Sequence, residues 1–315
     1  MNSSTVTPLH KAGATAPPDA ISLDGVTKSF GDVHAVRGID LHVAPGEVVA
    51  FLGPNGAGKT TTIDMLTGLS QPDQGRVEVF GMEPRAAIER GLVAAVMQTG
   101  GLLKDLTVGE TVDLTASLFA QTRSTTECLQ RAGIGDIADR LVGKCSGGQQ
   151  QRLRFAMALV SDPALIILDE PTTGMDVTGR RDFWSAIHSD AQRGRTVLFA
   201  THYLEEADQY ADRVVLVRHG QIVADGTSAE IKALAAGRVV KATLPEANAA
   251  ALQAIPGVES VDVRGDVVTF GTKDSDALAR HLLTHTPAYD LEITSQGLEA
   301  AFIALTGDDF EGASA

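Results

Sequence analysis

The sequence predicts an α/β protein whose larger part is built on a mainly parallel sheet and whose last part is a smaller α+β domain. Apolar runs alternate with helix patterns over residues 20–235, as in parallel sheets joined by helices. Two of these runs, 164–168 and 196–200, lack polar alternation, as expected for strands that are buried on both faces. The segment 107–160 is mostly helical in pattern, so we expect it to form a helical subdomain.

The elements of the larger part follow in order along the chain. Residues 1–19 are polar and rich in proline and small side chains, so we expect a disordered lead-in. The next elements are strands at 21–30, 39–43 and 47–52, a helix from 60 to 68, the two buried strands, a helix from 204, and a hairpin at 213–225 that turns at His219–Gly220. A capping box at Thr227–Glu230 then predicts a short helix that ends at Gly237.

Beyond this helix the pattern changes, and residues 236–315 predict a separate α+β domain of about 80 residues. Its expected strands are 239–244, 258–263, 267–270 and 291–294, and its expected helices are 247–255, 275–284 and 298–305. We expect this domain to act as an accessory or regulatory unit. Deleting it should leave nucleotide binding largely intact.

Charge and composition exclude several kinds of partner. The chain has 26 Lys and Arg against 40 Asp and Glu, a net charge of −14, which argues against nucleic acid and against a basic patch on anionic lipid. No apolar run approaches the roughly 18 residues that a membrane span needs. The two cysteines, Cys128 and Cys145, show no metal-binding spacing, and a reducing cytoplasm fits them. If the protein acts at a membrane, another protein must hold it there.

The stretch GPNGAGKT, Gly53 to Thr60, predicts a phosphate-binding loop because it lies between an expected strand and an expected helix. Glycines let the backbone N–H groups surround the phosphates, Lys59 can reach the β- and γ-phosphates, and the Thr60 hydroxyl can ligate Mg²⁺. The residues that we expect to contact nucleotide here are Gly53, Pro54, Asn55, Gly56, Ala57, Gly58, Lys59, Thr60 and Thr61.

Two acidic residues follow the buried strand in LIILDE. Asp169 ends the strand, where open α/β sheets bind their ligands, and can place Mg²⁺. Glu170 can polarise the attacking water as general base. An ordinary junction between a strand and a loop can have the same two residues. The lysine of the phosphate loop is what favours a functional role for them.

The stretch GKCSGGQQQRLRFAMALV predicts a second phosphate-binding helix end, without a lysine. Ser146, Gly147, Gly148 and Gln149 begin a helix whose amide groups form an anion site. With the phosphate loop, this serine–glycine–glycine motif and the Asp–Glu strand in this order, residues 20–235 resemble the ATP-binding subunits of ABC transporters. The resemblance implies an antiparallel β subdomain beside the parallel sheet.

The resemblance further implies that Ser146 and its neighbours bind the γ-phosphate of ATP that is held by an opposite subunit. ATP would then join two chains head to tail, either two copies of this chain or a copy and a paralogous subunit. Mg²⁺ would be held by Thr60, Gln98 and Asp169.

Four single residues take their expected roles from the same resemblance. Phe30 matches the aromatic residue that stacks on adenine, and Gln98 the glutamine that senses Mg²⁺ and γ-phosphate. Asp176 matches the aspartate that crosses the dimer, although an Asp before a helix is also a simple cap. His202 matches the histidine that contacts γ-phosphate, although a His at a strand end is often only a polar terminus.

Cys145 stands where this family usually has Leu. A buried cysteine packs like a small apolar residue, so we interpret it as a packing variant. The alternative is an acidic, oxidisable thiol beside a helix N-terminus.

The ending GLEAAFIALTG resembles the tail of ATP-binding subunits of the daunorubicin-resistance type, although the same residues also fit a simple apolar helix face. This resemblance implies the ATP-hydrolysing subunit of an exporter of drugs, lipids or secondary metabolites. A separate membrane permease would hold it at the cytoplasmic face of the cell membrane. The alternatives are the ATPase of an importer with a regulatory domain and a soluble ABC ATPase that does not transport. The transported substrate is not encoded here, because its pocket lies in the permease.

Overall fold

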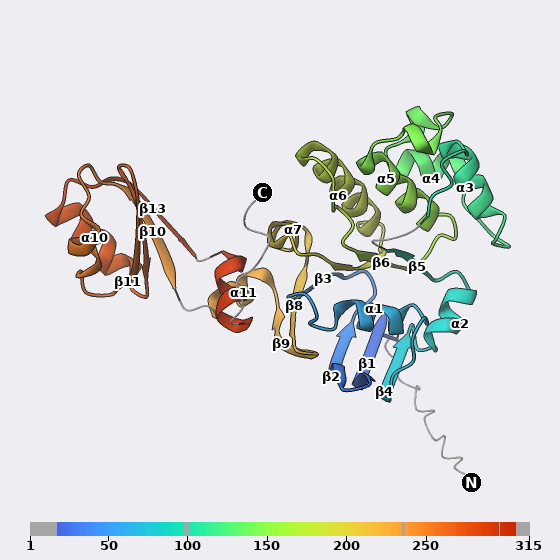
Figure 1. Ribbon diagram of the computed structural model, residues 1–315, viewed down its shortest axis with the longest axis horizontal. Coiled ribbons are helices and arrows are strands. Elements are labelled where there is room, and N and C mark those ends of the chain that lie inside the picture. Colours follow the sequence, from blue (N-terminus) through green and yellow to red (C-terminus); the bar gives the residue numbers. More distant parts are fainter. Residues whose placement is uncertain (1–17, 98–100, 235–236, 296, 307–315) are drawn as a thin grey trace, which may run out of the picture.

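The computed structural model describes residues 18–97, 101–234, 237–295 and 297–306. Its centre is a six-stranded sheet that is parallel except at one edge (Figure 1). The strands in spatial order are β5 (Val93–Val96), β6 (Leu165–Asp169), β7 (Thr196–Ala200), β3 (Val48–Leu52), β8 (Arg213–Arg218) and β9 (Gln221–Gly226). Only β9 runs antiparallel to its neighbour within this sheet. The predicted mainly parallel sheet is therefore confirmed.

Hydrophobic cores lie on both faces of this sheet, because successive side chains of a strand point to opposite sides. In β3, Ala50 contributes to one core and Phe51 to the other. The core of Ala50 includes α6 (Val177–Ala191) and the helical subdomain, and the core of Phe51 includes α1 (Lys59–Leu66). Burial on both faces explains why the central strands have no polar alternation.

An antiparallel sheet covers the side of α1 and was implied by the resemblance. Its strands are β2 (Val33–Val43), β1 (Ile21–Phe30) and β4 (Gln74–Val79), and the short helix α2 (Pro84–Glu89) follows. The expectation that the second strand is limited to 39–43 is wrong, since β2 starts at Val33. Gly38 has φ +83° and lies at a shift in register, so the strand continues through a bulge that breaks the apolar alternation.

The predicted helical subdomain is present over the described part of 107–160. It comprises α3 (Val108–Ala116), α4 (Thr125–Arg131), the 3₁₀ turns η1 (Gly135–Ile137) and η2 (Val142–Lys144), and α5 (Gly147–Ala158). Gly133, with φ +67°, follows the end of α4, as its position in the sequence suggested. No helix within the described ranges is long and apolar enough to cross a bilayer.

Two further helices flank the hairpin formed by β8 and β9. Helix α7 (Leu204–Tyr210) follows β7, and α8 (Ser228–Leu234) follows β9. The capping box predicted for α8 is confirmed, because the Thr227 N–H donates to the Glu230 carboxylate (2.8 Å) and the Glu230 N–H donates to the Thr227 hydroxyl (3.2 Å).

The last part of the chain contains a four-stranded antiparallel sheet with a core of its own. Its strands in spatial order are β11 (Val258–Arg264), β12 (Val267–Thr272), β10 (Arg238–Thr243) and β13 (Tyr289–Ser295), and its helices are α9 (Ala249–Gln253) and α10 (Ser275–His285). Phe270 and Leu282 are fully buried in this core. In Figure 1 the sheet stands apart from the six-stranded one.

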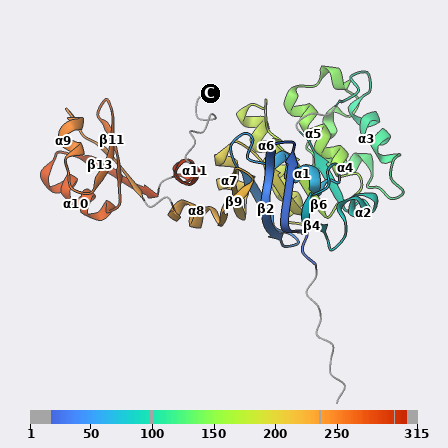
Figure 2. The same ribbon diagram turned by 60° about the horizontal axis from the view of Figure 1, so that its bottom comes forward.

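The final helix, α11 (Leu298–Thr306), does not pack on this small sheet. It contacts α8, α7 and β9, and both views in Figures 1 and 2 place it beside them. Its buried residues Leu298, Ala301 and Phe302 belong to the large core shared with α6. The expected placement of 298–305 in the C-terminal α+β domain is therefore wrong. The apolar face of this helix finds its partner across the chain, which local pattern could not indicate.

Candidate nucleotide site

The predicted phosphate loop, residues 53–60, connects β3 to α1 (Figure 1). Lys59 is only 9% exposed, and its Nζ donates to the carbonyl oxygens of Gly53 (2.6 Å) and Pro54 (3.2 Å). Helix α1 begins after Gly58 with no capping side chain, so its first amide groups and the lysine together form a site for an anion. Gly53, Ala57 and Gly58 are buried, and the remaining predicted loop ligands are partly or fully exposed, namely Pro54, Asn55, Gly56, Thr60 and Thr61.

Two other segments of the chain contact the phosphate loop and support it. Gly58 has φ +102°, and a Cβ at this position would lie 2.3 Å from the Ala35 carbonyl oxygen, so only glycine fits. The Gly220 N–H, in the turn between β8 and β9, donates to the Ala57 carbonyl (2.9 Å). The β8–β9 turn therefore supports the phosphate loop, a role that the hairpin pattern alone did not indicate.

The two acidic residues, Asp169 and Glu170, interact electrostatically with Lys59 of this loop. Asp169 ends β6 and is 7% exposed; burial raises the pKa of its carboxyl, while the charge of Lys59 opposes this. Burial likewise raises the pKa of Glu170 and lowers the pKa of Lys59, whose charged form is favoured by both carboxylates. Glu170 has φ +50°, and its N–H donates to the Ala200 carbonyl (2.9 Å). A non-glycine residue in this conformation is held there by its surroundings.

His202 lies in direct contact with Glu170. Its Nδ1 is 2.5 Å from the Glu170 Oε2, and its backbone N–H is 3.4 Å from the same oxygen. The carboxylate is mostly buried, with a side chain 15% exposed, whereas the His202 side chain is 38% exposed. One face of the site is thus a buried carboxylate paired with an accessible imidazole. Residues from β6 and β7 that lie far apart in sequence meet here because their strands are neighbours.

Ser146 is the N-cap of α5, the helix that the sequence predicted to start here. Its side chain accepts from the Gln149 N–H (3.2 Å), and the Gln149 side chain accepts from the Ser146 N–H (3.0 Å). A Cβ on Gly147 would lie 3.6 Å from the Gly174 carbonyl oxygen, and one on Gly148 would touch Met175. Among the described residues, no hydrogen bond or ion pair joins this helix start to the phosphate loop.

The structure describes two of the three other predicted positions, Phe30 and Asp176, but not Gln98. Phe30 ends β1 with 56% of its surface exposed, and the Lys28 Nζ lies 5.6 Å from its ring centroid. Asp176 caps α6 by accepting from the Gly179 N–H (2.6 Å). Gln98 lies outside the described residues.

Cys145 is 8% exposed, and its thiol lies 3.5 Å from the Leu141 carbonyl oxygen. Burial raises the pKa of this thiol, although Arg140 opposes the effect. A raised thiol pKa favours the interpretation of Cys145 as a packing variant over that of an acidic, oxidisable thiol.

Sequence reasoning missed Glu206. It stands next to Glu205 in the first turn of α7, where acidic residues commonly serve the helix dipole. Glu205 is exposed, but Glu206 is only 2% exposed and accepts hydrogen bonds from two buried threonines. Nothing in the local sequence separates the two residues; only the packing of α7 does.

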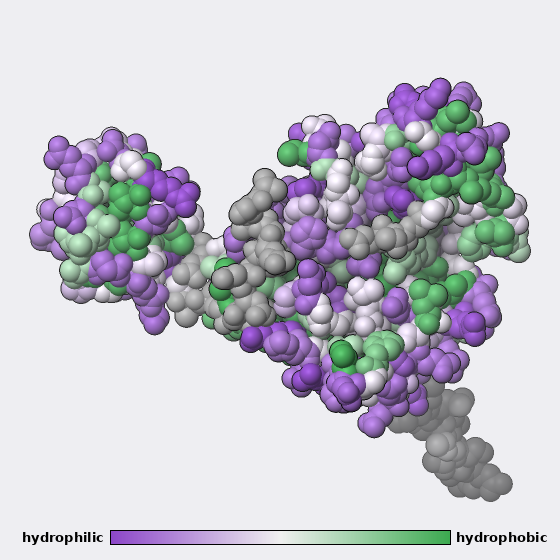
Figure 3. Space-filling model, viewed as in Figure 1, coloured by the Kyte–Doolittle hydropathy of each residue, from purple (hydrophilic) through white to green (hydrophobic). Residues whose placement is uncertain are grey.

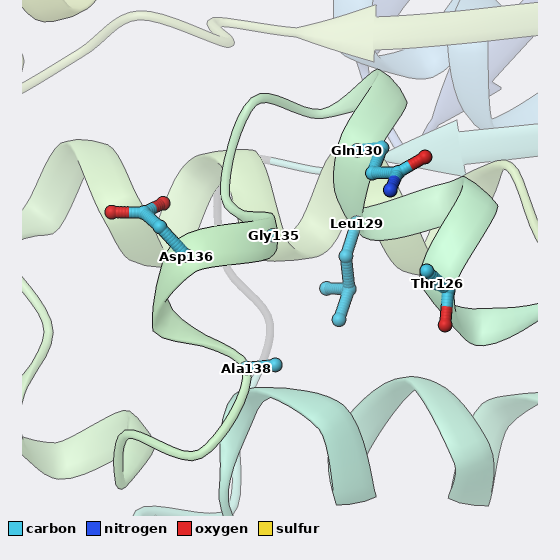
Figure 4. Close-up of a pocket in the computed structure, with 6 residues that line it drawn as sticks. All are labelled: Thr126, Leu129, Gln130, Gly135, Asp136 and Ala138. Carbon is cyan, nitrogen blue, oxygen red and sulfur yellow. The ribbon is translucent and has the colours of Figure 1, made fainter.

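A further pocket lies in the helical subdomain, away from these residues. It lies between α4 and η1 and is lined by Thr126, Leu129, Gln130, Gly135, Asp136 and Ala138 (Figure 4). Figure 4 shows Leu129 directed into the space and the carboxylate of Asp136 pointing away from it. Since it includes none of the predicted site residues, this pocket does not change the assignment of the phosphate site.

Comparison with known proteins identifies the chain's family. A family model described as "ABC transporter" matches residues 36–173. The daunorubicin/doxorubicin resistance ATP-binding protein DrrA of Streptomyces peucetius is 35% identical over 311 residues, which cover 93% of this chain and 94% of that protein. The Nod factor export ATP-binding protein I of Paraburkholderia xenovorans (strain LB400) is 35% identical over 306 residues, covering 94% and 99%.

Solved structures agree with these relatives. A dimeric ATP-binding cassette in a post-hydrolysis state, bound to ADP and Pi, matches with a TM-score of 0.59 and 26% identity. The match covers 66% of this chain and 98% of that one. The chain therefore belongs to the ATP-binding subunits of ABC transporters and is an ATP-hydrolysing subunit of the exporter type.

Proposed function

We propose that residues 53–60 bind the phosphates of Mg-ATP and that Glu170 activates the water that attacks the γ-phosphate. The observation that carries this proposal is the meeting of Lys59, Glu170 and His202 at one edge of the sheet, although they come from three separate segments. The uncapped first turn of α1 and the buried ammonium of Lys59 fit the negative charge of the phosphates. A carboxylate of raised pKa fits a general base better than an ordinary surface carboxylate does.

The oxygen atoms near the loop fit a magnesium ion. Thr60 is exposed in the first turn of α1, and Asp169 ends β6, a strand that contacts α1, so both residues could hold Mg²⁺ together with Gln98. Hydroxyl and carboxylate oxygens are ligands that this ion accepts, with phosphate oxygens and water completing its shell. When bound, Mg²⁺ would neutralise charge on the phosphate oxygens.

The protein's own residues would then divide the remaining work. Lys59 holds the β- and γ-phosphates, and Phe30 offers an exposed ring face on which adenine can stack. Glu170 takes a proton from water. The imidazole of His202 is more exposed than Glu170 and hydrogen-bonds to it through Nδ1. This imidazole contacts the γ-phosphate. His202 thereby orients Glu170, the general base, while it also contacts the γ-phosphate.

A second chain would complete each site. The start of α5 is partly exposed and makes no hydrogen bond or ion pair with the phosphate loop among the described residues; it comprises Ser146, Gly147, Gly148 and Gln149. Asp176 lies close by at the start of α6. The solved relatives include dimeric cassettes, which supports an ATP-joined dimer of two copies or of this chain with a paralogue.

A membrane permease is the expected third component. A groove beside β5 is lined by apolar and polar residues of β5, α3 and α5, including Met157, and by Leu102 and Phe119, which lie before and after α3. Leu114 in α3 and Leu118 just after this helix are also exposed, and Figure 3 shows apolar residues over this part of the molecule. We propose that a cytoplasmic helix of the permease docks here and holds the chain at the cytoplasmic face of the cell membrane. The named relatives concern drugs and Nod factors, which supports export of a drug, lipid or secondary metabolite.

The assignment is tested with Glu170→Gln and Lys59→Ala. Glu170→Gln should bind ATP, lower kcat by about 10²–10⁴-fold and accumulate as an ATP-bound dimer on size-exclusion chromatography, because only the proton acceptor is lost. Lys59→Ala should lose ATP binding itself. Glu205→Gln, which makes the same chemical change at an exposed position in α7, is the matched control. Parent turnover by Glu170→Gln would remove Glu170 from its role as base.

A further inference from the structure

Glu206 is a buried carboxylate that the chemistry described above does not use. It is 2% exposed, and burial raises its pKa, because a charge without water is unfavourable. The Thr172 hydroxyl donates to its Oε1 (2.5 Å), and the Thr201 hydroxyl donates to its Oε2 (3.0 Å). Both threonines are 1% exposed. One carboxylate therefore has both of its oxygens engaged by separate loops.

These two threonines belong to the loops that carry the reacting groups. Thr172 lies two residues after Glu170, and Thr201 lies immediately before His202. The Thr201 hydroxyl also accepts a hydrogen bond from the Tyr203 N–H (3.0 Å). This bond connects the residues on either side of His202. The loops after β6 and β7 are thus attached to the same side chain of α7.

Arg180 extends this arrangement toward the histidine. Its Nε lies 3.5 Å from the Glu206 Oε1, and its guanidinium lies 4.0 Å from the centroid of the Tyr203 ring. The Tyr203 ring centroid is in turn 4.1 Å from that of His202. Arg180 belongs to α6, the helix whose start is capped by Asp176. The carboxylate therefore links α6 to the loop of the histidine as well.

We propose that Glu206 is a positioning residue that fixes the loops of Glu170 and His202 and so keeps these two side chains in hydrogen-bonding contact. The proposal rests on the roles assigned to Glu170 and His202 above. Apart from the contact of their side chains, the two loops are joined near the site by the bond from the Glu170 N–H to the Ala200 carbonyl. A shift of about 1 Å in a reacting group can cost on the order of 10² in rate, so the anchoring of both loops matters for catalysis.

The alternative is that Glu206 only stabilises the fold. Both roles predict a lower melting temperature when the carboxylate is removed, so stability does not separate them. Only a positioning role predicts that kcat falls while the KM for ATP is kept, because the phosphate loop is not attached to Glu206. It also predicts that restoring one acceptor oxygen restores part of the rate.

The test measures ATP hydrolysis by the full-length chain, with its permease where hydrolysis requires it, for Glu206→Ala, Glu206→Gln and Thr201→Val. Assays run well below the melting temperature of each variant, and circular dichroism confirms folding. We expect Glu206→Ala to lower kcat by about 10–100-fold at an ATP KM within about twofold of the parent. Glu206→Gln should recover a large part of this loss, because its amide oxygen accepts one hydroxyl. Thr201→Val should show an intermediate loss, and Glu205→Gln should behave as the parent.

A folded Glu206→Ala with parent kcat overturns the proposal, as does a fall in kcat that merely follows a lost folded fraction. If Glu206→Ala does not fold, Thr201→Val decides, and parent kcat in that variant overturns the proposal. Glu170→Gln is measured in parallel. Its activity at the parent rate would refute the assigned base, whereas an inactive Glu170→Gln beside a fully active Glu206→Ala would refute only the positioning role.

Discussion

Removing the Phe302 ring should destabilise the ATPase part of the chain, although this residue lies beyond the small C-terminal sheet. Phe302 is fully buried in the core that α11 shares with α6 and the central sheet. Phe→Ala at such a position removes apolar contacts and leaves a cavity, which costs about 3–5 kcal/mol. That is a large share of the roughly 5–15 kcal/mol that stabilises a typical domain.

The single tryptophan of the chain makes this effect measurable for one domain alone. Trp184 is 1% exposed in the same core as Phe302, so its fluorescence reports the unfolding of the ATPase part. With an m-value near 2–3 kcal/mol per M of urea, Phe302→Ala should lower the midpoint by about 1–2.5 M. Phe270→Ala is the matched control, because Phe270 is equally buried but in the core of the small sheet.

The control should leave the tryptophan transition where it is. An unchanged midpoint in Phe302→Ala, or an equal shift in Phe270→Ala, would refute the packing of α11 on the ATPase part. The same reasoning changes the expectation for a deletion from residue 238 onward. That deletion also removes α11 and uncovers the surface of α7 and α8 that the helix buries. It should therefore lower this midpoint as well, even if nucleotide binding stays largely intact.

Other outcomes follow from the site. A mixture of Lys59→Ala and Ser146→Arg chains should regain part of the ATP-driven dimerisation that each lacks alone, because one site of the mixed dimer is intact; a fully active monomer on light scattering would contradict this. Burial raises the pKa of Glu170, and the general base must be ionised to act. We therefore expect kcat/KM to fall as the pH decreases through a value above the usual carboxyl range near 4.3. A fall in kcat/KM that occurs only at or below that range would argue against Glu170. The raised pKa of Cys145 predicts slow alkylation at neutral pH and parent hydrolysis by Cys145→Leu, whereas rapid alkylation that stops turnover would favour the reactive thiol.

The sequence by itself determined the features that are written in contiguous residues. The phosphate loop at 53–60 and the helix start at Ser146 are local structures, since glycines and a capping box act within a few positions. The central strands could also be predicted, because burial on both faces leaves an apolar run with no alternation. Strand β2 was found only in part, since its bulge at Gly38 interrupts the pattern that reveals a strand.

The tertiary structure alone decided which distant residues meet. The pairing of β6 with β7 places His202 against Glu170, and no spacing in the chain encodes a 2.5 Å contact between residues 32 positions apart. Of two adjacent glutamates in α7, packing buries only Glu206. The apolar face of α11 predicted burial but not its partner. A hydrophobic face is non-directional and needs only an apolar surface to cover it, so the fold chooses which surface that is.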